Sequence, residues 1–126
     1  MKVIHVITDL DIGGAEMMLY KLLASLRNNE IESLVITLMG RGKITERIEA
    51  LGVKVETLDL EQGARPSWNT IKKLKRIVRI SNPDIIQGWM YHGNIAATVA
   101  VFLFDPMRRK VKLFWNVRQT LYDINS

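Results

Sequence analysis

Residues 3–16 read VIHVITDLDIGGAE, an apolar run followed by a short acidic turn and a pair of glycines. The run Val3–Ile7 predicts a buried β-strand, and Gly13 and Gly14 stand where an amphipathic helix begins. A strand that turns through glycines into a helix brings backbone N–H groups and the positive end of a helix dipole to the edge of a parallel sheet. Open α/β folds bind ligands at that edge, so this stretch predicts a candidate site, with a ligand-free tight turn as the alternative.

Strand-like and helix-like patterns alternate along the rest of the chain. Apolar runs predict five strands, over residues 2–8, 33–39, 53–58, 84–88 and 111–117. Apolar residues at helical spacing predict four helices, over residues 15–26, 44–51, 68–78 and 95–104. Ser67 fits an N-cap, and Gly52 fits a helix end. Alternation of this kind predicts an α/β fold: a doubly wound, Rossmann-like parallel sheet of order 3-2-1-4-5 in a three-layer α/β/α arrangement.

Two of the predicted helices are expected to face the core. The helix over 68–78 would pack through Trp68, Ile71, Leu74, Ile77 and Val78. The helix over 95–104 is almost entirely apolar, which predicts burial, and it is too short to span a bilayer.

Composition limits the class of protein. With 126 residues, of which 48% are hydrophobic, residues 1–126 are expected to form a single domain. No cysteine is present, which excludes a disulfide framework, a thiol nucleophile and a thiolate metal site. The two histidines lack the spacing of a zinc motif, so no metal is expected. The start at Met1 shows no secretory leader, and a cytoplasmic location is therefore the expectation.

Four segments carry a family resemblance when taken in order. They are HVITDLDIGGAE at 5–16, ALGVKV at 50–55, NPDIIQGWMYHGN at 82–94 and FWNVRQT at 114–120. Together they resemble the N-terminal domain of group 1 (family 4) glycosyltransferases of the GT-B fold. The resemblance implies an enzyme that moves a sugar, with retention, from a nucleotide-sugar to a hydroxyl acceptor that is a saccharide or lipid-linked, as in cell-envelope polysaccharide synthesis.

The same resemblance implies a division of labour. In that family the N-terminal domain mainly binds the acceptor, and a C-terminal domain holds the nucleotide-sugar. This sequence stops after its fifth predicted strand, so the donor domain is expected to be absent and the chain alone inactive. The nucleotide-sugar enters as a substrate, no resident cofactor is expected, and the catalytic residues stay unassigned.

Site residues follow from the resemblance where this sequence matches it. Gly13 and Gly14 match a glycine loop near the donor phosphate. The acceptor-binding candidates stand on the predicted loops after the fourth and fifth strands: Tyr91, His92, Asn94, Asn116 and Arg118. Relatives often carry a histidine in the last segment, where this chain has Gln119, so a histidine acting from that loop is not supported.

Positive charge collects in two places. Net charge is +5, and one cluster, Lys72, Lys73, Lys75, Arg76 and Arg79, lies on a single predicted helix. The second cluster is Arg108, Arg109, Lys110 and Lys112. A basic amphipathic helix beside a tryptophan suits peripheral contact with an anionic membrane, at the inner face for a cytoplasmic protein, whereas an ordinary solvated helix face is the plainer interpretation. No nucleic-acid recognition motif accompanies the charge.

Other functions fit the sequence less well than a transferase does. A nicotinamide-binding Rossmann domain is disfavoured, because the first turn lacks GxGxxG and residues 39–41 read Met-Gly-Arg where an acidic residue is required. Asp9 and Asp11 fit turn formation better than a hydrolytic carboxylate pair. A non-catalytic ligand-binding α/β module stays an alternative. A domain separated from its partner also exposes apolar surface, which predicts self-association.

Overall fold

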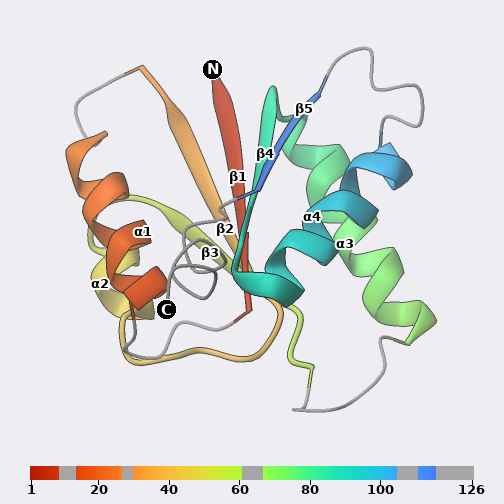
Figure 1. The fold of residues 1–126 in the computed structure, drawn as a ribbon, viewed down its shortest axis with the longest axis horizontal. Coiled ribbons are helices and arrows are strands. Elements are labelled where there is room, and N and C mark those ends of the chain that lie inside the picture. The colour runs from red at the N-terminus through yellow and green to blue at the C-terminus, as the bar shows by residue number, and fades with distance from the viewer. Residues whose placement is uncertain (9–13, 27–29, 61–66, 105–110, 116–126) are drawn as a thin grey trace, which may run out of the picture.

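Five parallel strands form one sheet with helices on both faces (Figure 1). The computed structural model describes residues 1–8, 14–26, 30–60, 67–104 and 111–115. The strands are β1 (Lys2–Ile7), β2 (Glu32–Thr37), β3 (Lys54–Thr57), β4 (Ile85–Trp89) and β5 (Lys112–Trp115). The helices are α1 (Gly14–Ser25), α2 (Thr45–Glu49), α3 (Trp68–Ser81) and α4 (Met90–Phe104).

The strand order is β3-β2-β1-β4-β5, and every neighbouring pair is parallel. In the central register, Ile4 of β1 pairs with Leu34 of β2 on one side and Ile86 of β4 on the other. This order confirms the predicted doubly wound sheet. Because the chain proceeds outward from β1 to β3 and then returns to β4, the strand order reverses between β1 and β4.

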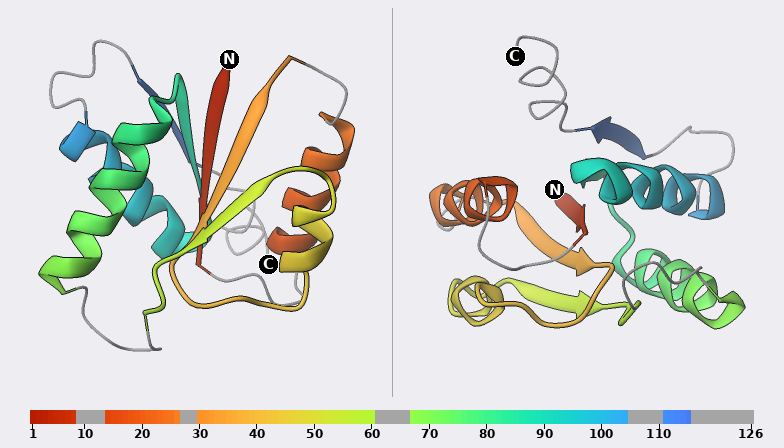
Figure 2. Two further views of the ribbon diagram at one scale, coloured as in Figure 1. Left: turned by 180° about the vertical axis from the view of Figure 1, so that it is seen from behind. Right: turned by 60° about the horizontal axis from the view of Figure 1, so that its bottom comes forward.

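Side chains alternate between two cores, one on each face of the sheet. Ile4 and Val6 of β1 pack on the face covered by α3 and α4, where Val78 and Val101 are also buried. Ile7 packs on the opposite face with Leu19, Leu23, Val35 and Ile48, beneath α1 and α2. Figure 2 shows the two helix pairs on opposite sides of the sheet. Burial on both faces explains why β1 reads as a nearly continuous apolar run.

Ser67 caps α3 as predicted, because its Oγ accepts a hydrogen bond from the backbone N–H of Thr70 at 3.2 Å. Removing that acceptor leaves one N–H of the first turn without its intramolecular partner, so Ser67→Ala is expected to lower the free energy of unfolding by about 1 kcal/mol. Urea denaturation checks this value. Asn69→Ala, within the same exposed turn, keeps the cap and serves as the control. Equal stability of the Ser67→Ala variant and the wild type would contradict the cap's contribution.

The predicted loop after the fourth strand is wrong. Trp89 is the last residue of β4, and α4 begins at Met90 with no intervening loop, five residues before the predicted start at Ile95. Gly93 has a low helix propensity, which made this segment read as a turn. In the structure Gly93 has no side chain to separate α4 from the sheet, so the helix packs closely on it. This packing outweighs the low helix propensity of glycine.

Two expectations of burial are also wrong. Trp68 is 67% exposed at the start of α3, although Leu74 and Val78 are buried as predicted. Along α4, Ile95, Val99 and Phe102 are all exposed. Only one face of each helix contacts the sheet, so a helix that is apolar on all sides still leaves its outer face uncovered. The exposed side chains of α4 therefore follow from its position in the outer layer.

Candidate functional site

The candidate site lies at the carboxyl ends of β1 and β4, at the bottom of Figure 1. From this edge α1 extends over one face of the sheet and α4 over the other (Figure 2). Both helices begin here, α1 at Gly14 and α4 at Met90. In doubly wound folds generally, ligands bind where the strand order reverses and the two helices extend over opposite faces of the sheet. Helix N-termini present N–H groups without intrahelical partners, which suit an anion or a hydroxyl-rich ligand.

Gly14 leaves open space at the start of α1. A Cβ built on it would meet no atom of the described residues within 4 Å, and its φ is not positive. Neither packing against the described residues nor an unusual backbone conformation therefore requires glycine at this position. The remaining consequence of glycine here is that position 14 itself has no side chain to cover the helix N-terminus. Gly13 lies outside the described residues.

Two glycines bring the first turns of α4 against the sheet. A Cβ on Gly93 would lie 2.7 Å from the carbonyl oxygen of Val6, at the end of β1. A Cβ on Gly88 would lie 2.6 Å from Cα of Asn94. Both distances are too short for a side chain, so these glycines hold the N-terminus of α4 directly beside β1. The sequence pattern singled out Gly13 and Gly14 as the glycines of the candidate site. It did not identify Gly88 and Gly93, which allow α4 to pack closely on the sheet.

The acceptor candidates of the fourth segment fall within α4. The backbone places Tyr91 and His92 in the first turn of the helix, at the same edge of the sheet as Gly14, while their side chains lie outside the description. Asn94 is partly buried, and its Oδ1 lies 2.6 Å from the position of a Cβ on Gly88, so this side chain lies over β4. Asn116 and Arg118 lie outside the described residues, as do Asp9, Asp11 and the basic cluster at 108–110.

A buried histidine and tryptophan lie just inside this edge, on the α1 face of the sheet. The indole Nε1–H of Trp89 donates to Nδ1 of His5 at 3.0 Å, and the ring centroids are 6.0 Å apart. Burial lowers the pKa of His5 to about 4, so the imidazole is neutral at pH 7. Since Nδ1 accepts, the ring proton resides on Nε2, which has no hydrogen-bond partner among the described residues.

Sequence reasoning treated His5 as part of an apolar run and placed Trp89 on a loop. The pairing register of β1 with β4 could have indicated that His5 and Trp89 lie close together. His5 and Ile7 alternate onto one face of β1, and Ile7 pairs with Trp89 of the neighbouring strand. A lone histidine inside an apolar strand, diagonal to a tryptophan, is a candidate for such a pair.

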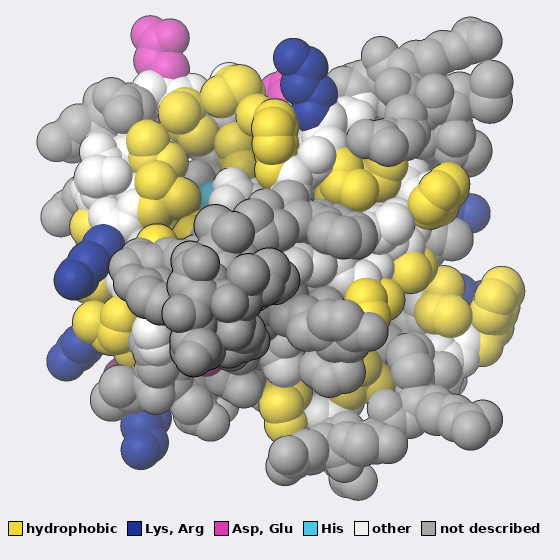
Figure 3. All heavy atoms as spheres, viewed as in Figure 1, with side chains coloured by type: hydrophobic (Ala, Val, Ile, Leu, Met, Phe, Trp, Pro, Cys, Tyr) yellow, Lys and Arg dark blue, Asp and Glu magenta, His cyan; other side chains and the backbone are white. Residues whose placement is uncertain are grey.

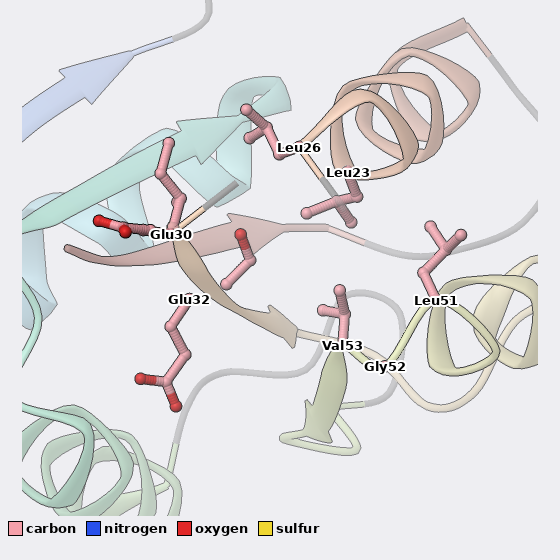
Figure 4. A pocket seen from close by; sticks show the side chains of 9 residues that line it. Leu23, Leu26, Glu30, Glu32, Leu51, Gly52 and Val53 are labelled. Carbon is pink, nitrogen blue, oxygen red and sulfur yellow. The ribbon is translucent and has the colours of Figure 1, made fainter. Parts of the chain in front are cut away.

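A hollow of about 370 Å³ lies at the opposite edge of the sheet (Figure 4). It lies between the end of α1, near Leu23 and Leu26, and the starts of β2 and β3, near Glu32 and Val53. Glu30 and Glu32 bring negative charge to this amino-edge hollow, which disfavours a phosphate. Parallel strands direct their ligand-binding loops to the other edge, so the candidate site is the carboxyl edge and not this hollow. Within the described ranges, no group of three or more His, Cys, Asp or Glu side chains could hold a metal.

A family model described as Glycosyltransferase Family 4 matches residues 12–121. The chain belongs to glycosyltransferase family 4. In this family 4 chain the match covers β4 and both helix N-termini of the candidate site, whereas β1 precedes the matched residues. No curated protein matches the chain in sequence. Within the described part of this family 4 chain, every helix is too short or too polar to cross a bilayer.

Solved structures share the fold of this family 4 chain. The 4-carboxy-2-hydroxymuconate hydratase from Pseudomonas putida aligns with a TM-score of 0.55 at 16% identity, over 88% of this chain and 62% of that one. The N,N'-diacetylchitobiose deacetylase from Pyrococcus horikoshii aligns with a TM-score of 0.54 at 18% identity, over 98% of this chain and 54% of that one. This chain spans less than two thirds of either protein. At such identities the likeness shows the α/β fold alone.

Proposed function

We propose that this family 4 chain forms the acceptor-binding half of a glycosyltransferase that moves a sugar from a nucleotide-sugar to a hydroxyl acceptor with retention. The observation that carries the proposal is that α1 and α4 both begin at the carboxyl edge of the sheet, where the strand order reverses between β1 and β4. Helix N-termini suit a diphosphate, and the crevice between two diverging helices suits a sugar. The product would be a cell-envelope saccharide, built on a saccharide or lipid-linked acceptor.

Roles within the proposed site follow from position. Gly13 and Gly14 would lie next to the donor diphosphate, because open space at Gly14 permits close approach to the backbone. Tyr91, His92 and Asn94, together with Asn116 and Arg118, would contact the acceptor. No resident cofactor or metal forms part of the proposal, and no residue is assigned a catalytic role.

The proposed chemistry depends on position and electrostatics. Sugar transfer passes through an oxocarbenium-like centre while a diphosphate departs, so the enzyme must orient the acceptor and stabilise the leaving phosphates. Orientation alone can contribute roughly 7–11 kcal/mol to lowering a barrier. A chain that supplies only the acceptor wall of a two-walled site loses that contribution. We therefore propose that the 126-residue chain is inactive by itself.

A transfer assay tests the proposal. Radiolabelled nucleotide-sugars are incubated with saccharide and lipid-linked acceptors, in the presence of the 126-residue chain or of a longer product of the same gene. We expect transfer only by a protein that also contains a nucleotide-sugar domain. Clear transfer by the short chain, lost on substitution of His92 or Gly14, would overturn the half-enzyme proposal and indicate a complete site, assembled for example across a dimer.

Gly14→Val tests the proposed phosphate contact. The new side chain enters open space, so the fold is expected to persist, while nucleotide-sugar binding weakens by about tenfold or more because the backbone N–H groups are obstructed. Calorimetry measures binding, and thermal unfolding measures stability. Ser25→Val, at the opposite end of α1, is the matched control and should bind as the wild type does. Unchanged binding by Gly14→Val would exclude this contact.

A further inference from the structure

The outer surface of the layer formed by α3 and α4 has an unusual charge pattern. The two helices pack against each other on one face of the sheet. Neither Trp68–Ser81 nor Met90–Phe104 contains a single aspartate or glutamate, although the chain has 13 of them. A solvated helix face ordinarily mixes both signs of charge. Positive charge on one helix, with no negative charge on that helix or its neighbour, indicates a partner of the opposite sign.

Four cations of this layer are available to such a partner. They share the exposed side of α3: Lys72, Lys75, Arg76 and Arg79. Lys73 differs, because its ammonium donates to the carbonyl oxygen of Thr57 and covers the edge strand β3. The contribution of α3 to the surface is therefore a net charge of four, and α4 carries no charged residue.

Large apolar side chains accompany the cations. On α3, Trp68 is 67% and Ile80 is 76% exposed, one at each end of the helix. On α4, Ile95, Val99 and Phe102 form an exposed row at helical spacing. Figure 3 shows hydrophobic side chains at the surface over both helices, at the right of the view. Apolar groups of this size on an outer surface mark an interaction site. They distinguish this surface from a basic helix face that contacts solvent alone.

The combination fits one partner. Cations on a helix face suit lipid phosphates, while an interfacial aromatic residue and exposed aliphatic side chains suit the acyl boundary beneath them. The ammonium of Lys72 lies 5.8 Å from the ring centroid of Trp68, so the charged and the apolar anchors are adjacent. We propose that the outer surface of α3 and α4 docks on an anionic lipid bilayer, parallel to the membrane plane.

This proposal goes beyond the proposed function and stands independently of it. Trp68 begins α3, and a helix that follows a parallel strand begins at the carboxyl edge of the sheet. Docking through α3 and α4 therefore holds the starts of these two helices, at that edge, close to the bilayer surface, with Gly14 on the other face of the sheet. An acceptor embedded in lipid would be presented to this edge, whereas a soluble acceptor would gain nothing from the arrangement.

Vesicle co-sedimentation of the 126-residue chain tests the docking. Vesicles of phosphatidylcholine mixed with phosphatidylglycerol are compared with vesicles of phosphatidylcholine alone, and binding is expected only to the anionic set. Since each cation near the surface contributes about fivefold to binding, the double variant Lys75→Gln/Arg79→Gln should bind roughly 30-fold more weakly. Phe102→Ser should weaken binding about fivefold through its lost apolar contact. Both changes involve exposed side chains, and unchanged thermal unfolding verifies the fold.

The matched control is the double variant Lys43→Gln/Arg47→Gln, which removes two exposed cations at α2, in the layer on the other face of the sheet. It should bind as the wild type does. The proposal is overturned by equal binding to neutral and anionic vesicles, by equal weakening in both double variants, or by tighter binding to single-stranded RNA than to vesicles at the same phosphate concentration. Sugar binding at the carboxyl edge is measured in the absence of lipid. A negative result in that measurement would count against the proposed function and would leave the membrane docking untouched.

Discussion

Gly93→Ala is expected to lower the free energy of unfolding by about 3 kcal/mol or more, because the new methyl group meets backbone on the facing strand. Its Cβ would lie 2.7 Å from the carbonyl oxygen of Val6 and 3.1 Å from Cα of Ile7. Neither atom can move without displacing the end of β1, which pairs with both β2 and β4. The first turn of α4 would have to lift away from the sheet, and the candidate site would widen with it.

Urea denaturation of Gly93→Ala, Gly14→Ala and the wild type measures this effect. Gly14 is the matched control, because it also lies in the first turn of a helix at the same edge, yet a Cβ there meets no atom of the described part of the chain within 4 Å. Gly14→Ala should therefore be neutral or stabilising by up to about 1 kcal/mol. If Gly93→Ala is as stable as Gly14→Ala, the close packing of α4 on β1 is incorrect.

The second large effect is a loss of stability in acid that depends on His5. Burial lowers the pKa of His5 from 6.5 to about 4, so between these values the unfolded chain binds a proton that the folded chain does not. Stability from this residue is complete above about pH 6.5 and is lost as the pH falls toward 4. At about 1.4 kcal/mol per pH unit, the loss amounts to roughly 3 kcal/mol over that interval.

Denaturation curves at several pH values between 4 and 7 check this prediction. Carboxylates also titrate near the lower limit, so the informative quantity is the difference between the wild type and His5→Asn. The amide oxygen of asparagine can still accept from Nε1 of Trp89, while the titrating imidazole is gone. The difference should change by roughly 3 kcal/mol over the interval. An identical pH dependence in His5→Asn and the wild type would contradict a buried, neutral His5.

Sequence periodicity was sufficient for the sheet because each strand's pattern reflects its neighbours. The nearly unbroken apolar residues of β1 and β2 require cover on both faces, which places these strands inside the sheet. The alternation in β3 is typical of an edge, and β3 lies at one edge of the sheet. The residue pattern of each strand records which of its faces are buried. The patterns together therefore predicted both the fold class and the strand order.

The candidate site was less predictable because it depends on contacts between distant segments. The start of α4 was missed because Gly93 weakens a helix by propensity, and its benefit, the contact with Val6, appears only when β1 and β4 are adjacent. Likewise, the hydrogen bond of Trp89 to His5 joins residues 84 positions apart. Trp68 was assigned to the core from helical spacing alone, although only the fold determines which side of α3 contacts the sheet.

The proposed function requires that this family 4 chain bind sugar ligands at the switch point between β1 and β4. Amide chemical-shift mapping tests it most directly: the isotope-labelled chain is titrated with nucleotide-sugars and with saccharide acceptors, and the perturbed N–H groups are located on the fold. We predict perturbations at Gly14 and Ala15 in α1 and at Gly93 and Asn94 in α4, all at the carboxyl edge. Perturbations confined to the amino-edge hollow, near Glu32 and Val53, or the absence of any perturbation at saturating ligand, would contradict the account.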